Sequence, residues 1–245
     1  MKVHYDFSGR TVLIAGAASG IGHAMAWACQ QAGAQVVAGD IAGEGLSALR
    51  IAGMRTQQLD IAQTREVDDW IQGVHSTYGR LDAAILTSAI QRRVPVEDMT
   101  DLEWQRHLDV NLTGIFKLIR AIVPIMKRQQ SGAIVTFTSG LAQSGWPGAG
   151  AYAATKAGLV GLIKSVAIEL RHHGVRINAV SPGLVTTPVF LNSASVDELA
   201  TYEKSLGVST PEEVVPTLMH LISDGAAHIS GNVVERRLIP RAKQG

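Results

Sequence analysis

Short apolar runs alternate with longer segments of helical period along the whole chain. The runs expected to form strands are Thr11–Ala15, Gln35–Gly39, Met54–Leu59, Ala83–Thr87, Ala133–Thr138, Arg176–Ser181 and Val233–Ile239. Helices are expected near 21–32, 44–51, 64–77, 101–128, 151–172 and 211–223. The strand runs are continuously apolar, which is typical of strands buried on both faces. This order predicts a parallel sheet with helices on both of its faces.

A chain of 245 residues can form one large α/β domain or two small ones. No linker or repeat interrupts the pattern, so residues 1–245 are expected to form a single doubly wound α/β domain. A net charge of +1 argues against bulk attraction to nucleic acid or to an anionic membrane. The single cysteine, Cys29, excludes an internal disulfide, and no Cys/His cluster has zinc spacing. With no apolar leader and no apolar stretch of about 18 residues, the expected location is a reducing cytoplasm.

Acid–base chemistry is indicated by three residues near the middle of the chain. Tyr152 and Lys156 share one face of the predicted helix, and Ser139 follows a predicted strand. An ammonium beside a phenol stabilises the phenolate, so Tyr152 is expected to exchange a proton near neutral pH. Ser139 adds a hydroxyl donor at the reacting oxygen. The pair is a weak signal by itself, because a surface helix carrying a lysine has the same spacing.

A glycine-rich turn supplies the context for this trio. Gly16, Gly20 and Gly22 stand between the first predicted strand and its helix, where a backbone can approach a pyrophosphate at a helix N-terminus. Asp40 ends the second strand, and its carboxylate suits the two hydroxyls of an adenosine ribose. The same carboxylate would repel a 2′-phosphate, which favours NAD over NADP. An aspartate that merely opens a loop is the alternative.

These motifs together resemble the short-chain dehydrogenase/reductase family over most of the chain. The glycines match the family turn T-G-x-x-x-G-x-G, with Ala15 in place of Thr. The trio matches the catalytic residues, including a gap of thirteen positions between Ser139 and Tyr152. The resemblance implies a Rossmann-like sheet, a nicotinamide cofactor and assembly into homo-dimers or homo-tetramers. The short Tyr–Lys gap argues against the enoyl-reductase branch, whose gap is longer.

The resemblance also implies a set of site residues. Asn111, in the run DVNLTG, matches an asparagine that holds a water behind the active-site lysine and is grouped with the catalytic trio. The expected cofactor-binding residues are Gly16, Ser19, Gly20, Ile21, Gly22, Asp40, Asp60, Ile61, Ala89, Tyr152, Lys156, Pro182, Gly183, Val185 and Thr187. The expected substrate-binding residues are Ser139, Leu141, Trp146, Tyr152 and Leu184. Residues 91–94, Gln143 and 189–206 are further candidates for the pocket wall. The side chains of Gln91, Arg92, Arg93 and Gln143 suit a hydroxyl or a carboxylate, although each arginine is more often a solvated loop charge.

Two departures from the family pattern bear on function. Ile90 stands where a glycine normally lets the cofactor's ribose lie close, so its side chain is expected to crowd the cofactor, to push the loop outward or to pack inward. The C-terminal run Glu235-Arg236-Arg237 replaces V-D-G-G and is expected to form an exposed edge or an ion-paired interface. A nucleic-acid role for Arg236, Arg237, Arg241 and Lys243 is a weaker alternative to a solvated tail.

The leading hypothesis is an NAD-dependent dehydrogenase that acts on the CH–OH group of a secondary alcohol, or on its ketone. A catalytically idle, cofactor-sensing or scaffold protein on the same fold is the alternative. The sequence does not choose among sugars, polyols, hydroxy acids, β-ketoacyl groups and steroids as substrate.

Overall fold

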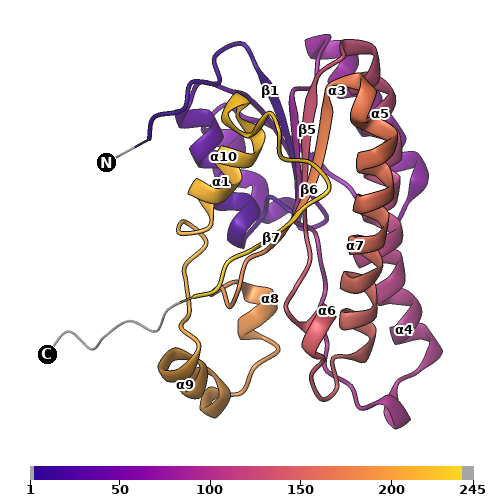
Figure 1. Ribbon diagram of the computed structural model, residues 1–245, viewed down its shortest axis with the longest axis vertical. Helices are drawn as coiled ribbons and strands as arrows, with labels where there is room; N and C mark the ends of the chain where they lie inside the picture. The colour runs from indigo at the N-terminus through magenta and orange to yellow at the C-terminus, as the bar shows by residue number, and fades with distance from the viewer. Residues whose placement is uncertain (1–2, 239–245) are drawn as a thin grey trace, which may run out of the picture.

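A computed structural model describes residues 3–238 as one twisted parallel sheet flanked by helices (Figure 1). The strands are β1 (Thr11–Ala15), β2 (Gln35–Asp40), β3 (Arg55–Gln58), β4 (Ala83–Leu86), β5 (Gly132–Phe137), β6 (Val175–Ser181) and β7 (Val233–Glu235). Their order across the sheet is β3-β2-β1-β4-β5-β6-β7, and every neighbouring pair is parallel. The predicted fold class is confirmed.

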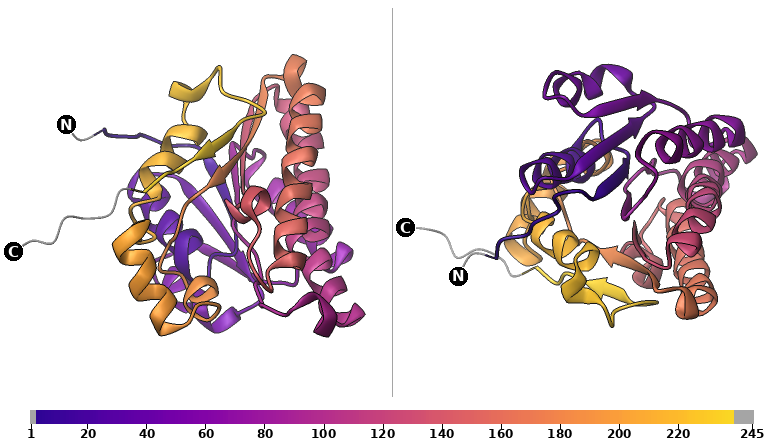
Figure 2. Two further views of the ribbon diagram at one scale, coloured as in Figure 1. Left: turned by 60° about the horizontal axis from the view of Figure 1, so that its bottom comes forward. Right: turned by 90° about the horizontal axis from the view of Figure 1, so that it is seen from above.

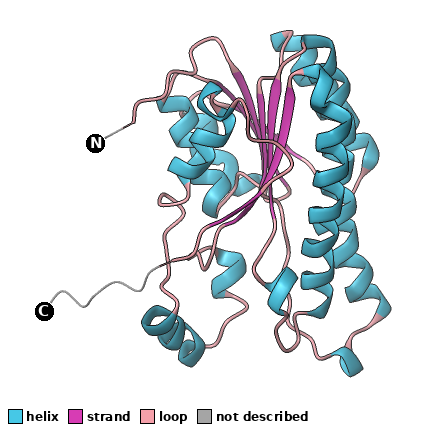
Figure 3. Cartoon of the chain, viewed as in Figure 1, coloured by secondary structure: helices cyan, strands magenta, loops and turns pink. Residues whose placement is uncertain are grey.

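Helices cover both faces of this sheet, as the three-layer arrangement in Figures 2 and 3 shows. One face carries α3 (Thr64–Tyr78), α5 (Ile115–Gln129) and α7 (Gly150–Leu170), and the other carries α1 (Gly20–Gln31) and α10 (Val215–Ile222). Alternate residues of β1 enter different cores: Leu13 packs under α3 and α5, whereas Ile14 packs under α1 and α10. Two-sided burial explains why central strands such as β1 and β4 are continuously apolar, whereas the edge strand β3, with the sequence RTQQ, is polar and mostly exposed.

The longest predicted helix is divided by a distortion. The segment 101–128 becomes α4 (Asp101–Leu108), a π-helical stretch (Asp109–Gly114) and then α5. Three short helices were not predicted: α6 (Leu141–Ser144), α8 (Pro188–Leu191) and α9 (Val196–Ser205). The predicted helix near 44–51 is a 3-10 turn (Gly43–Leu46) followed by α2 (Ser47–Ile51). In Figure 1, α8 and α9 lie below the sheet, beyond the carboxyl ends of its strands.

The helix α7 corrects one expectation about membranes. Within residues 3–238, the stretch Gly150–His173 is long and apolar enough to span a bilayer by length and composition. One face of α7 packs on the sheet, and Leu159 and Ile163 lie in the core there. Its other face is open to solvent, with Ile168 65% exposed. A core helix that crosses no membrane can pass the same test of length and composition, so the stretch carries no membrane assignment.

The unusual C-terminal run forms a short edge strand. The strand is Val233–Glu235, and the described residues 236–238 are not part of it, although the N–H of Arg236 still donates to the carbonyl of Ser181 at 2.9 Å. Ile239, Arg241 and Lys243 lie outside the described residues. Arg237 pairs with Glu235 at 3.1 Å. Arg236 turns back and donates to the carbonyl of Pro182 at 3.0 Å and to that of Glu213 at 2.9 Å. The charges therefore fit an exposed edge whose arginines are engaged within the chain.

Candidate active site

A cavity of about 820 Å³ opens at the carboxyl ends of the strands. It is lined by residues that follow β1, β2, β4, β5 and β6, which is where open parallel sheets bind ligands. The structure gathers almost every predicted site residue around it: Gly16, Ser19, Gly20, Ile21, Asp40, Asp60, Ile61, Ala89, Ser139, Leu141, Trp146, Tyr152, Lys156, Pro182, Gly183, Leu184, Val185 and Thr187. Gly22 and Asn111 are the two predicted site residues that do not line this cavity.

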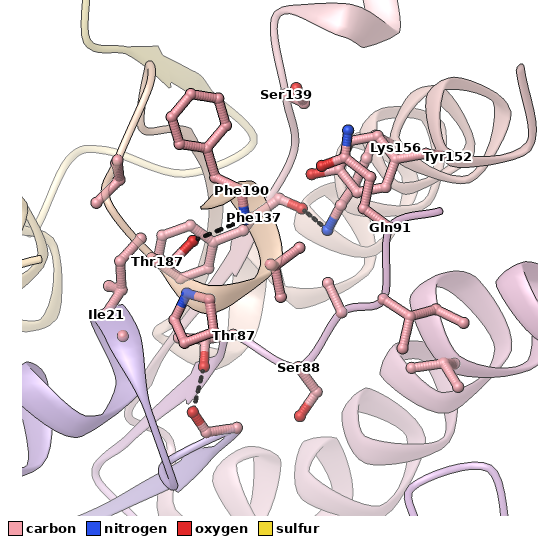
Figure 4. Close-up of a pocket in the computed structure, with 18 of the residues that line it drawn as sticks. Ile21, Thr87, Ser88, Gln91, Phe137, Ser139, Tyr152, Lys156, Thr187 and Phe190 are labelled. Carbon is pink, nitrogen blue, oxygen red and sulfur yellow. Dashed lines mark hydrogen bonds between the residues drawn. The ribbon is translucent and has the colours of Figure 1, made fainter. Parts of the chain in front are cut away.

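The trio meets at one side of this cavity (Figure 4). Ser139 follows β5, while Tyr152 and Lys156 come from the first turns of α7. The Lys156 ammonium lies 5.5 Å from the centroid of the Tyr152 ring and donates to the carbonyl of Phe137 at 2.8 Å. The buried end of β5 thus fixes the lysine beneath the tyrosine.

Burial governs the protonation of this pair in the structure. It raises the pKa of Tyr152 to about 12, and a hydrogen bond with Ser139 opposes that rise. Burial also lowers the pKa of Lys156 to about 8. The expected lowering of the Tyr152 pKa is therefore not found in the protein alone. The free energy lost when a phenolate is removed from water exceeds the free energy gained from its attraction to the ammonium at this distance.

Asn111 is not among the residues that line the cavity, and its expected water-holding role stays a prediction. Its side chain is fully buried in the π-helical stretch. The amide oxygen accepts from the N–H of Ile90 and the amide nitrogen donates to the carbonyl of Ile90, both at 2.8 Å, with a further contact to Thr155. This side chain therefore anchors the loop after β4 rather than reaching the cavity. The π-helical stretch itself is a feature common at functional sites.

The glycine-rich turn has the shape that a pyrophosphate needs. Gly16 has φ of +86°, and a side chain on Gly22 would collide with the carbonyl of Gly16. Thr87, which the sequence did not single out, ties this turn to β4 by donating to the carbonyls of Ala15 and Gly16. No side chain caps α1 at Ser19, so its first-turn N–H groups remain available to an anion.

The carboxylate of Asp40 is held in place at the end of β2. One oxygen accepts from the N–H of Ala18 and the other from the N–H of Ala42, each at 2.9 Å. Each oxygen keeps a second lone pair for a hydroxyl donor. Asp60 is fixed in a similar way, with one oxygen accepting from the N–H of Ala62 at 2.9 Å. The residues present therefore fit the adenosine half of a dinucleotide.

The opposite half of the cavity is mostly apolar. Trp146, Phe190 and Tyr202 form a cluster, with Tyr202 lying 6.0 Å from Trp146 and 6.2 Å from Phe190 between ring centroids. Leu141, Leu184, Val189 and Leu206 extend this wall. Two sequence candidates are turned elsewhere, which corrects the prediction. Gln143 donates to Glu235 at 3.0 Å, and Arg92 pairs with Glu103 at 3.4 Å, so neither lines the cavity.

Comparison with known proteins agrees with this geometry. Residues 16–235 match the family profile described as enoyl-(acyl carrier protein) reductase. A 3-oxoacyl-[acyl-carrier-protein] reductase of Thermotoga maritima is 35% identical over 234 residues, which cover 92% of this chain and 95% of that protein. A second protein with that name, from Synechocystis, is 33% identical over 91% of this chain and 93% of its own. The crystal structure of levodione reductase superposes with a TM-score of 0.88 at 29% identity, covering 94% of this chain and 97% of that one.

Proposed function

Because this chain belongs to the short-chain dehydrogenase/reductase family of oxidoreductases, we propose that it transfers a hydride between NAD(H) and a secondary alcohol or its ketone. The observation that carries this proposal is the position of Tyr152. Its phenol stands over the Lys156 ammonium, beside Ser139, in the same cavity as the glycine-rich turn.

Each member of the trio has a separate task. Tyr152 gives a proton to the carbonyl oxygen during reduction and takes one from the hydroxyl during oxidation. Ser139 donates a hydrogen bond to the same oxygen and polarises it. Lys156 holds a positive charge beneath the phenol and stabilises the phenolate that forms as the proton leaves. A bound nicotinamide would supply the hydride, and the protein orients it.

The raised pKa of Tyr152 favours reduction of a ketone over oxidation of an alcohol at neutral pH. A phenol with a pKa near 12 is protonated at neutral pH, so it is ready to donate to a ketone. Oxidation of an alcohol needs the phenolate and should accelerate as the pH rises. Asn111 supports the trio by fixing the loop at Ile90 through two hydrogen bonds.

NAD is the preferred cofactor on electrostatic grounds. Asp40 presents a carboxylate to the ribose end of the cavity. The described lining residues that carry a positive side chain are Arg93, Arg106 and Lys156, and none of them comes from the turn after β1 or the segment after β2. A 2′-phosphate would meet a negative charge without a compensating cation, which costs binding free energy.

A carbonyl rather than a carbon–carbon double bond is the proposed acceptor. Tyr152 and Lys156 are separated by three residues, whereas the enoyl-reductase branch of the family has a longer gap. Hydride transfer to a carbonyl also needs a proton at oxygen, which the trio can supply.

The test is a panel of secondary alcohols with NAD and of ketones with NADH, followed by absorbance of the reduced cofactor. Tyr152→Phe keeps the ring and removes the transferable proton, so kcat should fall at least about a hundredfold. Cofactor binding, measured by fluorescence of NADH, should change little in this variant. Retention of more than about a tenth of kcat would contradict the role of Tyr152. A panel without any turnover, alongside normal NADH binding, would support a cofactor-sensing protein instead.

A further inference from the structure

Among the described residues that line the cavity, Arg93 is the cation at its substrate end. Its guanidinium carbon lies 6.0 Å from the centroid of the Trp146 ring, and both residues line the cavity. Lys156 is engaged below Tyr152, and Arg106 is exposed on α4. If Arg93 were free, it would attract a substrate carboxylate, because its fork of N–H donors matches that group.

The guanidinium of Arg93 already forms an ion pair with Glu198. An Nη atom of Arg93 donates to a carboxylate oxygen of Glu198 at 2.7 Å, and the two side chains are only 20% and 29% exposed. The other oxygen of Glu198 accepts from the N–H of Ser195 in a capping box that begins α9. These contacts, led by the Ser195 N–H, hold the pKa of the Glu198 carboxyl below its usual value. The carboxylate is therefore charged whenever the protein is near neutral pH.

The pair is partly covered by the aromatic wall. The Nε atom of Arg93 is buried and has no hydrogen-bond partner among the described residues. Trp146 lies against the guanidinium, and Tyr202, on the same helix as Glu198, lies against Trp146. The segment that supplies the apolar wall thus also supplies the charge that neutralises Arg93.

We propose that this site selects uncharged, largely apolar ketones and secondary alcohols, and that Glu198 sets the selection by keeping Arg93 neutralised. The inference rests on the proposed function and names its substrate class. A carboxylate brought into this part of the cavity would be desolvated beside Glu198 without a free cation to pair with. Removing the charge of Glu198 would release Arg93 and give that carboxylate a partner.

The experiment compares two ligands that differ in charge: para-acetylbenzoate and its methyl ester. Isothermal titration calorimetry gives their dissociation constants on protein loaded with oxidised NAD, which carries no hydride, so neither ketone can react. The proteins are wild type, Glu198→Gln, the double variant Glu198→Gln/Arg93→Gln, and Asp197→Asn. Glutamine at 198 can still complete the capping box. Asp197→Asn is the matched control, because it removes the same charge from the neighbouring position of α9.

Wild type should bind the ester at least about tenfold more tightly than the acid, since a lone buried carboxylate is poorly tolerated. Glu198→Gln should shift this ratio toward the acid by about tenfold, the worth of one charge-assisted hydrogen bond. The double variant should lose that shift, and Asp197→Asn should leave the wild-type ratio nearly unchanged.

Three outcomes would overturn the proposal. They are tighter binding of the acid by wild type, equal shifts in Glu198→Gln and Asp197→Asn, and no binding of either compound to wild type. Because binding is read without turnover, the result is separate from the proposed reaction. The expected ratios without activity on any ketone would defeat the hydride transfer and leave the charge selection standing.

Discussion

The side chain of Asn111 holds both backbone polar groups of Ile90, accepting from its N–H and donating to its carbonyl at 2.8 Å each. The pair joins the π-helical stretch after α4 to the loop after β4. Ile90 is half-buried, lines the cavity and does not adopt a positive φ. The backbone at this position therefore does not require glycine. Any effect of Ile90 on cofactor binding must come from its side chain.

Ile90→Gly should tighten NAD binding, because it removes a side chain from the cavity wall. Glycine's backbone entropy should cost about 1 kcal/mol of stability. Titration of NAD and thermal melts measure the two effects, with Ile90→Val as the matched control that keeps the branched shape. Unchanged or weaker NAD binding together with a stability loss of about 1.5–3 kcal/mol would identify Ile90 as a packing residue instead.

Lys156 should make stability depend on pH in the alkaline range. Its pKa is about 8 in the folded protein against 10.5 in the unfolded chain, so between these values the unfolded chain holds more protons. The free energy of unfolding should then rise with pH, at a slope approaching about 1.4 kcal/mol per unit. Tyr152 acts oppositely above pH 10, because its folded pKa of about 12 exceeds the unfolded value of 10.0.

Chemical denaturation at pH 7 to 10 of wild type and Lys156→Met isolates this contribution. The stability of wild type relative to the variant should increase across the upper part of that range. Lys164→Met, two turns further along α7 at an exposed position, is the control and should follow wild type. Parallel curves for wild type and Lys156→Met would mean that burial does not shift the Lys156 pKa.

Asp40 should decide between NAD and NADP. The kcat/KM of wild type should be much higher with NAD than with NADP. Asp40→Ala should reduce this ratio, because it weakens NAD binding and removes the repulsion of the 2′-phosphate. Asp40→Asn removes the charge and keeps the size of the side chain, but its single amide oxygen can accept from only one of the N–H groups of Ala18 and Ala42, so its stability is measured alongside. Equal use of both cofactors by wild type would show that Asp40 is not the ribose ligand.

Assembly should depend on the open faces of α5 and α7. Phe116 on α5 is 41% exposed and Ile168 on α7 is 65% exposed, which suits a homo-dimer or homo-tetramer formed through these helices. Ile168→Lys should shift sedimentation toward the monomer. Ile51→Lys is the control, since Ile51 on α2 is 88% exposed and apolar too. A wild-type monomer at micromolar concentration would refute this expectation.

The sequence alone determined the sheet, the turn and the trio, because their signals are local. Apolar runs specify two-sided burial in the central strands, and the ends of the predicted strands agree with the structure to within one residue except at β7. The glycines of the first turn are required by backbone geometry that involves only their neighbours. The spacing of Tyr152 and Lys156 follows from a single helix.

Only the tertiary structure decided which partners the functional side chains contact. Asn111 turned to Ile90, and Arg93 turned to Glu198, 105 positions away. Arg92 pairs with Glu103, and Gln143 donates to Glu235, so neither side chain lines the cavity. The direction of the Tyr152 pKa shift depended on burial, which neighbours in space impose. Such partners are chosen by packing between distant segments, and no local pattern of residues records that choice.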